Sequence, residues 1–317
     1  MEHPPPENDS QIRAGGRIPG TQGISAFALN GPDPSRIPVL IAVPHAGRTY
    51  PGTLVRNMRN PGASALKLED RFVDRLAEEV AARTGALLLV AHAPRAMIDL
   101  NRAPDDVDWE MFATEDRPAS DAHGPNRRSR SGLGLIPRRL PGIGELWKRR
   151  HFRDELAARI DGIHAPYHAC LAETLEDLRN RWGAAVLLDL HSMPPIGARL
   201  GQRSPEFVLG DRFGASCDGS LVAESFAYFS EIDRMAAHNR PYAGGYVLER
   251  HAAPQHGMHA LQLEIDRSAY LDSAFERPGR DFADMAQMLA GLVRRLANAV
   301  IQLGGTGNAT GWPEAAE

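Results

Sequence analysis

The chain has 317 residues, 43% of them hydrophobic and 24% charged, which suits a globular protein with a sizeable core. Its formal net charge of -4, from 36 basic and 40 acidic residues, gives no support for binding nucleic acid or an anionic membrane. No apolar run approaches the roughly 20 residues of a membrane span, and the polar, proline-rich start lacks the apolar core of a signal peptide. We therefore expect a cytoplasmic protein with reduced cysteines that acts on a small molecule.

Composition along the chain predicts one folded domain between two flexible ends. Residues 1–22 and 304–317 are rich in glycine, proline and polar side chains, which favours a flexible N-terminal arm and a flexible C-terminal tail. Residues 23–303 are predicted to form a single α/β domain. The loop at residues 103–142, rich in Asp, Arg, Gly and Pro, is long enough to suggest a function that the sequence does not specify.

Within the domain, short apolar runs alternate with segments of helical periodicity. The predicted strands are residues 38–43, 86–91, 96–100, 184–190 and 261–265, and the predicted helices are residues 70–84, 144–156, 157–181, 220–235 and 282–303. Strands separated by such helices predict a mostly parallel, mixed central sheet with helices on both faces. In such sheets ligands bind outside the carboxyl ends of the strands.

Polar side chains stand at the ends of these predicted strands. His45 and His191 each follow an apolar run, Asn101 and Arg102 follow a third, and Glu264 lies inside the run at residues 261–265. A carboxylate buried without a partner costs several kcal/mol, so Glu264 requires an arginine, a metal or a catalytic task. Two histidines and a carboxylate, with a fourth position open to water, are typical of a catalytic zinc site. The alternatives are loop histidines and a strand acid paired with arginine.

Seven motifs in order resemble those of the N-formylglutamate amidohydrolase family. They are VPHAGR (43–48), LEDRFVD (68–74), IDLNR (98–102), HAPYH (164–168), LDLHSM (188–193), NRPYAGGY (239–246) and LQLEI (261–265). The resemblance runs from about residue 38 to residue 296. Because that family is similar to zinc carboxypeptidases and aspartoacylase-type enzymes, it implies a zinc-carboxypeptidase-like fold and a bound Zn²⁺ or another divalent metal.

The resemblance also implies roles for individual residues. His45 and His191 would be metal ligands, and Glu264 would be the general acid/base. The peptidases carry a His-x-x-Glu pair, but Arg48 stands three residues after His45 here, so another residue must be the third ligand. We favour Asp70 for it.

Three further carboxylates have alternative roles at this site. Glu69 is the second choice for the third ligand. Asp99 and Asp189 are candidates to orient the histidines, and Asp189 shares a strand face with His191 through the period of two.

Recognition of N-formylglutamate requires cations, because this substrate carries two carboxylates beside the scissile amide. The candidate substrate-binding residues are Arg48, Asn101, Arg102, Arg240 and Tyr246. By the resemblance, Asn101 and Arg102 match an Asn-Arg pair that grips a carboxylate. Arg95 is a further cation candidate. Tyr246, or Tyr242 as the alternative, is a candidate to donate a hydrogen bond to the oxyanion that develops on the substrate.

The predicted reaction yields formate and L-glutamate, and the family association places it in histidine breakdown. Two alternatives remain open. One is a zinc amidase or carboxypeptidase-like hydrolase that acts on another acidic N-acyl amino acid or peptide. The other is a non-catalytic protein that binds an acidic metabolite. The sequence leaves the oligomeric state open.

Overall fold

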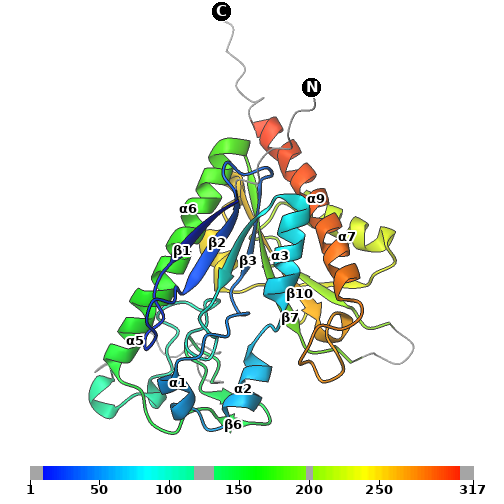
Figure 1. Ribbon diagram of the computed structural model, residues 1–317. Coiled ribbons are helices and arrows are strands. Elements are labelled where there is room, and N and C mark those ends of the chain that lie inside the picture. The colour runs from blue at the N-terminus through cyan, green and yellow to red at the C-terminus, as the bar shows by residue number, and fades with distance from the viewer. Residues whose placement is uncertain (1–9, 118–131, 198–202, 308–317) are drawn as a thin grey trace, which may run out of the picture.

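The computed structural model describes residues 10–117, 132–197 and 203–307, which contain an eight-stranded sheet between two layers of helices (Figure 1). The strand order is β1-β2-β4-β3-β7-β10-β8-β9, and the four central strands run parallel to one another. The strands are β1 Ser10–Gly15, β2 Phe27–Pro32, β3 Val39–Val43, β4 Leu87–Ala91, β7 Ala185–Met193, β8 Phe207–Gly210, β9 Ala236–His238 and β10 Met258–Asp266. A separate small hairpin consists of β5 Arg139–Leu140 and β6 Gly144–Glu145.

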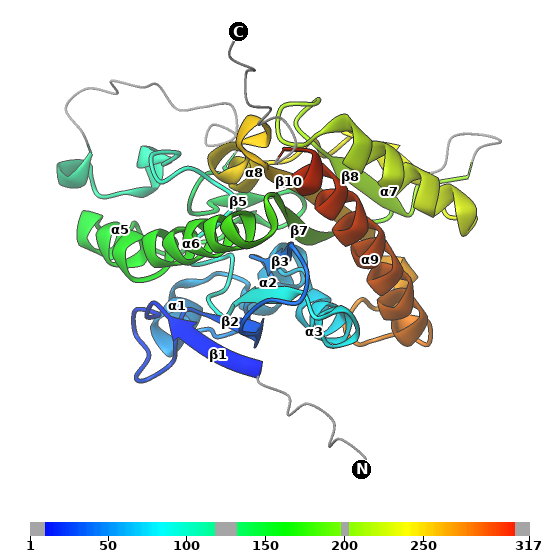
Figure 2. The ribbon, with the colours of Figure 1, turned by 90° about the horizontal axis from the view of Figure 1, so that it is seen from above.

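Helices cover both faces of the sheet, as Figure 2 shows from above. The α-helices of the described residues are α1 Gly52–Asn57, α2 Pro61–Leu68, α3 Val73–Thr84, α5 Arg153–Arg159, α6 Ala165–Trp182, α7 Gly219–Glu231, α8 Tyr246–His251 and α9 Phe282–Gly307. α6 lies on one face, whereas α3 and α9 pack together on the other. The predicted α/β fold, with a mostly parallel mixed sheet covered on both faces, is confirmed. In the described ranges no helix combines the length and the apolar character that a bilayer span demands.

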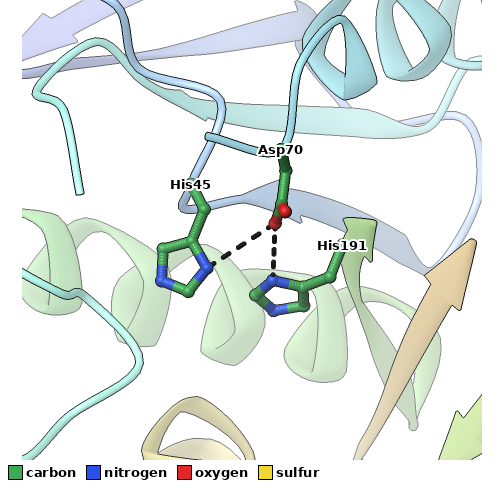
Figure 3. Close-up of side chains that lie close together, drawn as sticks. All are labelled: His45, Asp70 and His191. Carbon is green, nitrogen blue, oxygen red and sulfur yellow. Dashed lines mark hydrogen bonds and ion pairs between the residues drawn. The ribbon is translucent and has the colours of Figure 1, made fainter. Parts of the chain in front are cut away.

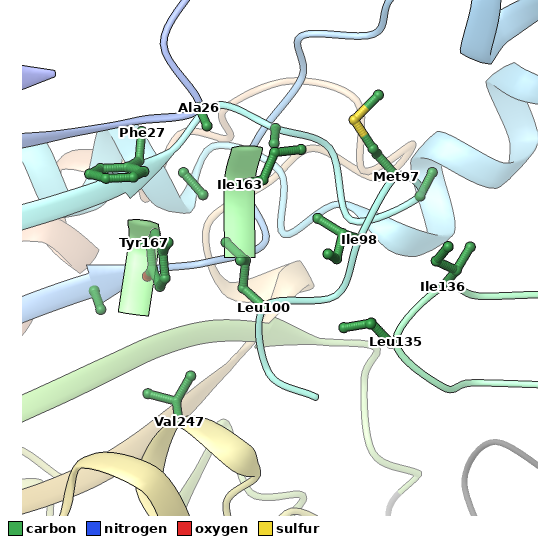
Figure 4. Packing of buried hydrophobic residues seen from close by; sticks show 14 of the residues in the cluster. Ala26, Phe27, Met97, Ile98, Leu100, Leu135, Ile136, Ile163, Tyr167 and Val247 are labelled. Atoms are coloured by element: carbon green, nitrogen blue, oxygen red, sulfur yellow. The ribbon is translucent and has the colours of Figure 1, made fainter. Parts of the chain in front are cut away.

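Each central strand contributes to two cores, because its side chains point alternately to opposite faces of the sheet. Leu40 of β3 lies in the core under α6, and the next residue, Ile41, lies in the core under α3 and α9. Figure 4 shows part of the first core, where the ring of Tyr167 meets the ring of Phe27 edge-on at 5.7 Å between centroids. Burial on both faces explains why these strands read as continuous apolar runs.

A proline determines how the helical segment that carries α6 begins. Pro166 has no backbone N–H, so the carbonyl of Gly162, four residues earlier, has no helical partner. That carbonyl accepts a hydrogen bond from the backbone N–H of Arg17 at 2.7 Å, and residues 160–164 form a π-turn. The helix predicted over residues 157–181 is therefore two helices joined by this turn, and the N-terminal segment is attached to the junction.

Two further predicted elements differ from the structure. Residues 96–100, expected to be a strand, form a series of turns in which Met97 and Ile98 donate to the carbonyl of Pro94. The segment is apolar because it packs in the core under α6, and burial alone does not distinguish a strand from a buried loop. The helix predicted at residues 144–156 begins only at Arg153, since the backbone before it pairs with other loops: Lys148 N donates to Asn57 O.

The flexible N-terminal arm predicted for residues 1–22 is wrong over its second half. Ser10–Gly15 pairs along β2 as the edge strand β1, and Ile18 is fully buried. Backbone hydrogen bonds hold β1 in place, and a polar composition does not reveal them. At the other end, α9 continues to Gly307, so residues 304–307 of the predicted tail are helical. The remainder of the arm and of the tail lies outside the described residues, as does the middle of the predicted loop at residues 103–142.

Candidate active site

The carboxyl ends of three neighbouring strands bring the predicted polar residues together. His45 follows β3 after one proline, His191 lies near the end of β7, and Glu264 lies near the end of β10. β7 lies between β3 and β10, and Glu264 pairs in register with His191. Asp70 joins them from the turn between α2 and α3. The sheet topology thus places four polar side chains at one edge, where ligands of open α/β sheets bind.

Two imidazoles and a carboxylate converge at this edge (Figure 3). Oδ2 of Asp70 lies 3.1 Å from Nδ1 of His191 and 3.6 Å from Nδ1 of His45. Each residue offers one ligand atom, and these three atoms lie within 4.8 Å of one another. All three residues are buried. Glu69, the second choice for the third ligand, points elsewhere, with Oε2 3.7 Å from Nε of Arg71.

Further carboxylates fix the direction of both imidazole rings. Nε2 of His45 contacts Oδ1 of Asp99 at 2.7 Å, and Nε2 of His191 contacts Oδ2 of Asp189 at 2.9 Å. The orienting contacts expected for Asp99 and Asp189 are therefore confirmed. Because carboxylates accept the proton on each Nε2, both rings turn Nδ1 toward the same point.

One of these ring nitrogens has the carboxylate of Asp70 at 3.6 Å but no hydrogen-bond partner. Nδ1 of His45 is buried and accepts or donates no hydrogen bond within the described residues. Burial by itself raises the pKa of Asp70, but its interactions with His191 at 3.1 Å and with His45 at 3.6 Å hold that pKa well below its ordinary value. The pKa of Asp99 is also well below its ordinary value, since Arg95 and His45 outweigh the effect of burial. An orphaned imidazole nitrogen beside ionised carboxylates suits a divalent cation, for which neutral imidazole and carboxylate are ordinary ligands.

Glu264 has a different electrostatic environment. Burial raises its pKa to about 7, with a further increase from Asp70 and an opposing effect from His191 and Arg95. Nε2 of Gln262 donates to its Oε1 at 2.8 Å. A carboxyl group with a pKa near neutrality can both take and give a proton, which is what a general acid/base does.

These residues line a cavity of about 320 Å³. Its lining comprises His45, Lys67, Leu68, Asp70, Arg95, Asn101, Leu133, Leu140, Pro141, His191, Ser192, Pro194, Tyr242, Ala243, Gly244, Gly245, Gln262, Glu264 and Arg267. Cavities of about 390 and 430 Å³ lie beside β2 and between α1 and α5. Size therefore does not identify the site; the convergence of titratable groups does.

Three of the cationic side chains that the structure describes line this cavity. Arg95 donates from Nε to Asp99 at 2.9 Å, so its charge is matched by a carboxylate. Arg267 donates from Nε to the hydroxyl of Ser192 at 3.0 Å and from its guanidinium to two backbone carbonyls. Lys67 donates to the carbonyl of Pro141. Nη2 of Arg267 also forms an ion pair with Oδ1 of Asp70 at 3.4 Å. Lys67 thus brings to the cavity a positive charge that bonds to a neutral group, whereas the charge of Arg267 also faces the carboxylate of Asp70.

Of the predicted substrate-binding residues, Asn101 lines the cavity. Both Arg48 and Arg102 have protein partners: Arg48 forms a bidentate ion pair with Asp74, and Arg102 donates to the carbonyls of Leu133 and Asn101.

Arg240 and Tyr246 belong to the loop at residues 239–246, which also supplies Tyr242 to the cavity lining. The side chain of Arg240 is exposed. Tyr246 begins α8, and its hydroxyl accepts a hydrogen bond from Arg250. The described residues that line the cavity do not include Arg48, Arg102, Arg240 or Tyr246.

Sequence reasoning missed Lys67, Gln262 and Arg267, and for two of them a signal existed. Gln262 precedes Glu264 by two residues on one strand, so the period of two places both on the same face. Arg267 follows the end of β10 directly, at the edge where ligands are expected. For Lys67, in α2, the sequence offers no comparable signal.

Behind the cavity, His164 and His168 of the HAPYH motif have structural contacts. Nε2 of His164 donates to the carbonyl of Arg102 at 2.9 Å, and Nε2 of His168 donates to the carbonyl of Leu100 at 3.0 Å. Nδ1 of His168 therefore accepts from Nε2 of His251 at 2.9 Å. The two histidines hold the backbone on either side of Asn101.

The buried histidines predict a pH dependence of stability. Burial lowers the pKa of His251 to about 3 and the pKa of His168 well below its usual value. The unfolded chain binds protons near pH 6.5 that the folded chain does not, so the free energy of unfolding falls as the pH drops below about 6.5. The slope is about 1.4 kcal/mol per pH unit for each such group.

Urea unfolding of wild type and His251→Gln between pH 6.5 and 5 measures this dependence of the free energy of unfolding on pH. In the variant, the free energy of unfolding should fall less steeply with pH, by the contribution of one histidine. An unchanged slope would contradict the lowered pKa of His251.

Comparisons with known proteins agree with this fold. Residues 37–271 match the family model for N-formylglutamate amidohydrolase. The chain is 29% identical over 276 residues to the N-formylglutamate deformylase of Pseudomonas aeruginosa and 30% identical over 279 residues to that of Pseudomonas putida. Each alignment covers 85% of this chain and 94% of the relative.

Solved structures give the same result. The crystal structure of an N-formylglutamate amidohydrolase from Ralstonia eutropha JMP134 matches with a TM-score of 0.79 and 31% identity, covering 88% of this chain and 99% of that one. The gene product Atu2144 from Agrobacterium tumefaciens matches with a TM-score of 0.62 and 19% identity over 87% of this chain and 96% of that one, which shows a shared fold. The family model alone spans well over half of the residues. The resemblance found in the sequence is thus confirmed, and the chain is a hydrolase that belongs to the N-formylglutamate amidohydrolase family.

Proposed function

We propose that this protein is a metal-dependent amidohydrolase that cleaves N-formyl-L-glutamate to formate and L-glutamate, or a close N-acyl acidic amino acid to the corresponding acid and amino acid. The observation that carries the proposal is the convergence of His45, Asp70 and His191, with an unpartnered Nδ1 on His45, beside a glutamate whose pKa is about 7. Family membership favours this substrate class. We further propose a cytoplasmic role in histidine breakdown, an inference from the family and the composition.

The donor set fits Zn²⁺ or another divalent ion, with His45, His191 and Asp70 as the residues that would hold it. When bound, such an ion supplies a Lewis acid that polarises the amide carbonyl and makes water more acidic. Asp99 and Asp189 keep both Nδ1 atoms directed at the ion's position. Those contacts prevent either ring from turning away.

Glu264 is proposed to take a proton from the attacking water and to pass it to the departing nitrogen of glutamate. Its raised pKa suits both halves of this transfer, because a group that titrates near neutrality is a competent base and a competent acid. Tyr242 also lines the cavity and has a phenol to donate toward the carbonyl oxygen as negative charge develops there.

Lys67 and Arg267 are proposed to attract the two carboxylates of the substrate. Both line the cavity. Lys67 bonds to a neutral carbonyl, so a substrate carboxylate gains its attraction without breaking an ion pair. Arg267 bonds to a hydroxyl and to two carbonyls as well as to Asp70 at 3.4 Å, so its charge is shared between Asp70 and the cavity. Arg95 is less suited, since Asp99 already matches its charge. Acid recognition is therefore assigned to residues other than the arginines that the motifs suggested.

A substrate series tests this assignment. Metal-loaded enzyme is assayed on the N-formyl, N-acetyl and N-succinyl derivatives of glutamate and aspartate, and N-formylglutamate should give the highest kcat/KM. Lys67→Met should raise KM for it by about tenfold, equivalent to about 1.4 kcal/mol, with little change in kcat. The exposed Lys148→Met, which lies outside the cavity lining, is the matched control. A higher kcat/KM on an acetyl or succinyl derivative would reassign the acyl group.

A further inference from the structure

The side-chain amide of Asn101 has a fixed orientation. The backbone N–H of Val247, which can only donate, bonds to Oδ1 of Asn101 at 2.9 Å. Nδ2 of Asn101 must therefore point the other way, where it lies 3.3 Å from Oε1 of Gln262. A Cβ on Gly245 would lie 2.4 Å from Oδ1 of Asn101, so the loop backbone packs directly on this amide. The amide is thus held by one hydrogen bond on each side and by close packing.

The same reasoning fixes the next side chain. Because Oε1 of Gln262 accepts from Asn101, its Nε2 is the atom that faces Glu264, and it donates to Oε1 of Glu264 at 2.8 Å. Asn101, Gln262 and Glu264 are all buried. Val247 thus donates to Asn101, Asn101 donates to Gln262, and Gln262 donates to Glu264. Rotating either side-chain amide by 180° would break a buried hydrogen bond.

The backbone around Asn101 is also held from behind. The imidazoles of His168 and His164 donate to the carbonyls of Leu100 and Arg102, on either side of Asn101. The backbone that carries Asn101 is therefore attached to α6 and to the π-turn before it. A side chain supported in this way can hold its neighbour in one rotamer.

We propose that Asn101 and Gln262 are positioning residues that hold the carboxylate of Glu264 in one rotamer, with Oε1 engaged as an acceptor and Oε2 left for proton transfer. Asn101 thus acts through Gln262, rather than by gripping a substrate carboxylate. The inference rests on the role proposed above for Glu264, and it assigns a function to Gln262, a residue of the LQLEI motif to which the sequence analysis gave no role.

Gln262→Met is the first test, since methionine keeps the volume of glutamine and removes both hydrogen bonds. On the best substrate of the series, kcat should fall about tenfold, or about 1.4 kcal/mol, with KM and metal content unchanged. Gln287→Met, on the exposed side of α9, is the matched control and should behave as wild type. Gln262→Glu keeps the acceptor for Asn101 but loses the donor, so it should lose kcat similarly if Gln262→Met does not fold.

A double-mutant cycle tests whether the two amides act in series. Asn101→Asp keeps an acceptor for Val247 and removes the donor to Gln262, so kcat should fall about as far as in Gln262→Met. The double variant should then lose no more than either single variant. If Asn101 instead binds substrate, its replacement raises KM and the two effects multiply, which overturns the proposal.

A structural readout separates this inference from the proposed function. Crystal structures of wild type and Gln262→Met should show Glu264 in a different rotamer in the variant, whatever the substrate. An unchanged Glu264, or an unchanged kcat in the variant, refutes the positioning role even if wild type cleaves N-formylglutamate. Lack of cleavage by wild type refutes the substrate assignment while leaving the crystallographic comparison decisive for Gln262.

Discussion

Replacing His191 with alanine is expected to remove most of the bound metal and to lower kcat/KM by about a thousandfold, or about 4 kcal/mol of transition-state stabilisation. The imidazole lies 3.1 Å from Asp70 and is fixed from behind by Asp189, so no neighbouring side chain replaces its Nδ1. His45→Ala should behave in the same way. Elemental analysis after dialysis, together with steady-state kinetics, measures both effects.

Two controls make this result specific. His256→Ala removes an exposed imidazole outside the cavity lining and should keep both metal and activity. Asp70→Asn and Glu69→Gln change adjacent carboxylates, of which only Asp70 lies near the imidazoles. Only the Asp70 variant should lose metal. Full metal content in His45→Ala and His191→Ala would show that the ion is bound at another place in the protein.

Replacing Glu264 with glutamine is expected to leave the metal content intact and to lower kcat by about 10²- to 10⁴-fold, the range that general acid–base groups contribute. Glutamine is nearly isosteric but neither accepts nor returns a proton. Glu79→Gln, on the exposed side of α3, is the matched control. A fully active Glu264→Gln enzyme would assign proton transfer to another group.

The same residue predicts the acid limb of the pH profile. Burial raises the pKa of Glu264 to about 7 in the protein without metal, and a cation nearby would lower it, because positive charge favours the carboxylate. The base is the carboxylate form, so kcat/KM should fall as the pH drops through that pKa, somewhat below 7. Rate measurements from pH 4.5 to 9 locate the limb, and the residual activity of Glu264→Gln should lack it.

The central strands of the sheet were predictable because strands that are buried on both faces consist mainly of apolar residues. β3, β4 and the first half of β7 appear as continuous apolar runs, and β10 alternates apolar with polar residues. A polar residue that interrupts or follows such a buried run has few explanations other than function. The rule that ligands bind at the carboxyl ends then places His45 and His191 at one edge. The contact between Asp189 and His191 follows from the period of two alone.

The flanks of the sheet and the arginines could not be predicted in this way. β1 is polar and pairs with a strand more than ten residues away, and β8 and β9 are only four and three residues long, so pairing partners decide whether these segments are strands. The role of an arginine depends on which acceptor its long side chain reaches. Arg48 reaches Asp74, a contact that its place in a motif does not reveal.

Both imidazoles face Asp70 through Nδ1, the ring nitrogen nearer to the backbone. Few rotatable bonds would separate an ion bound there from the backbone of β7 and of the end of β3. The positions of its two imidazole ligands would therefore vary as little as the backbone of these strands does. Loosening of the surface loops would then have little effect on coordination, and release of the ion would require the centre of the sheet to open. Loss of the ion and cooperative unfolding of the core would accordingly coincide on heating.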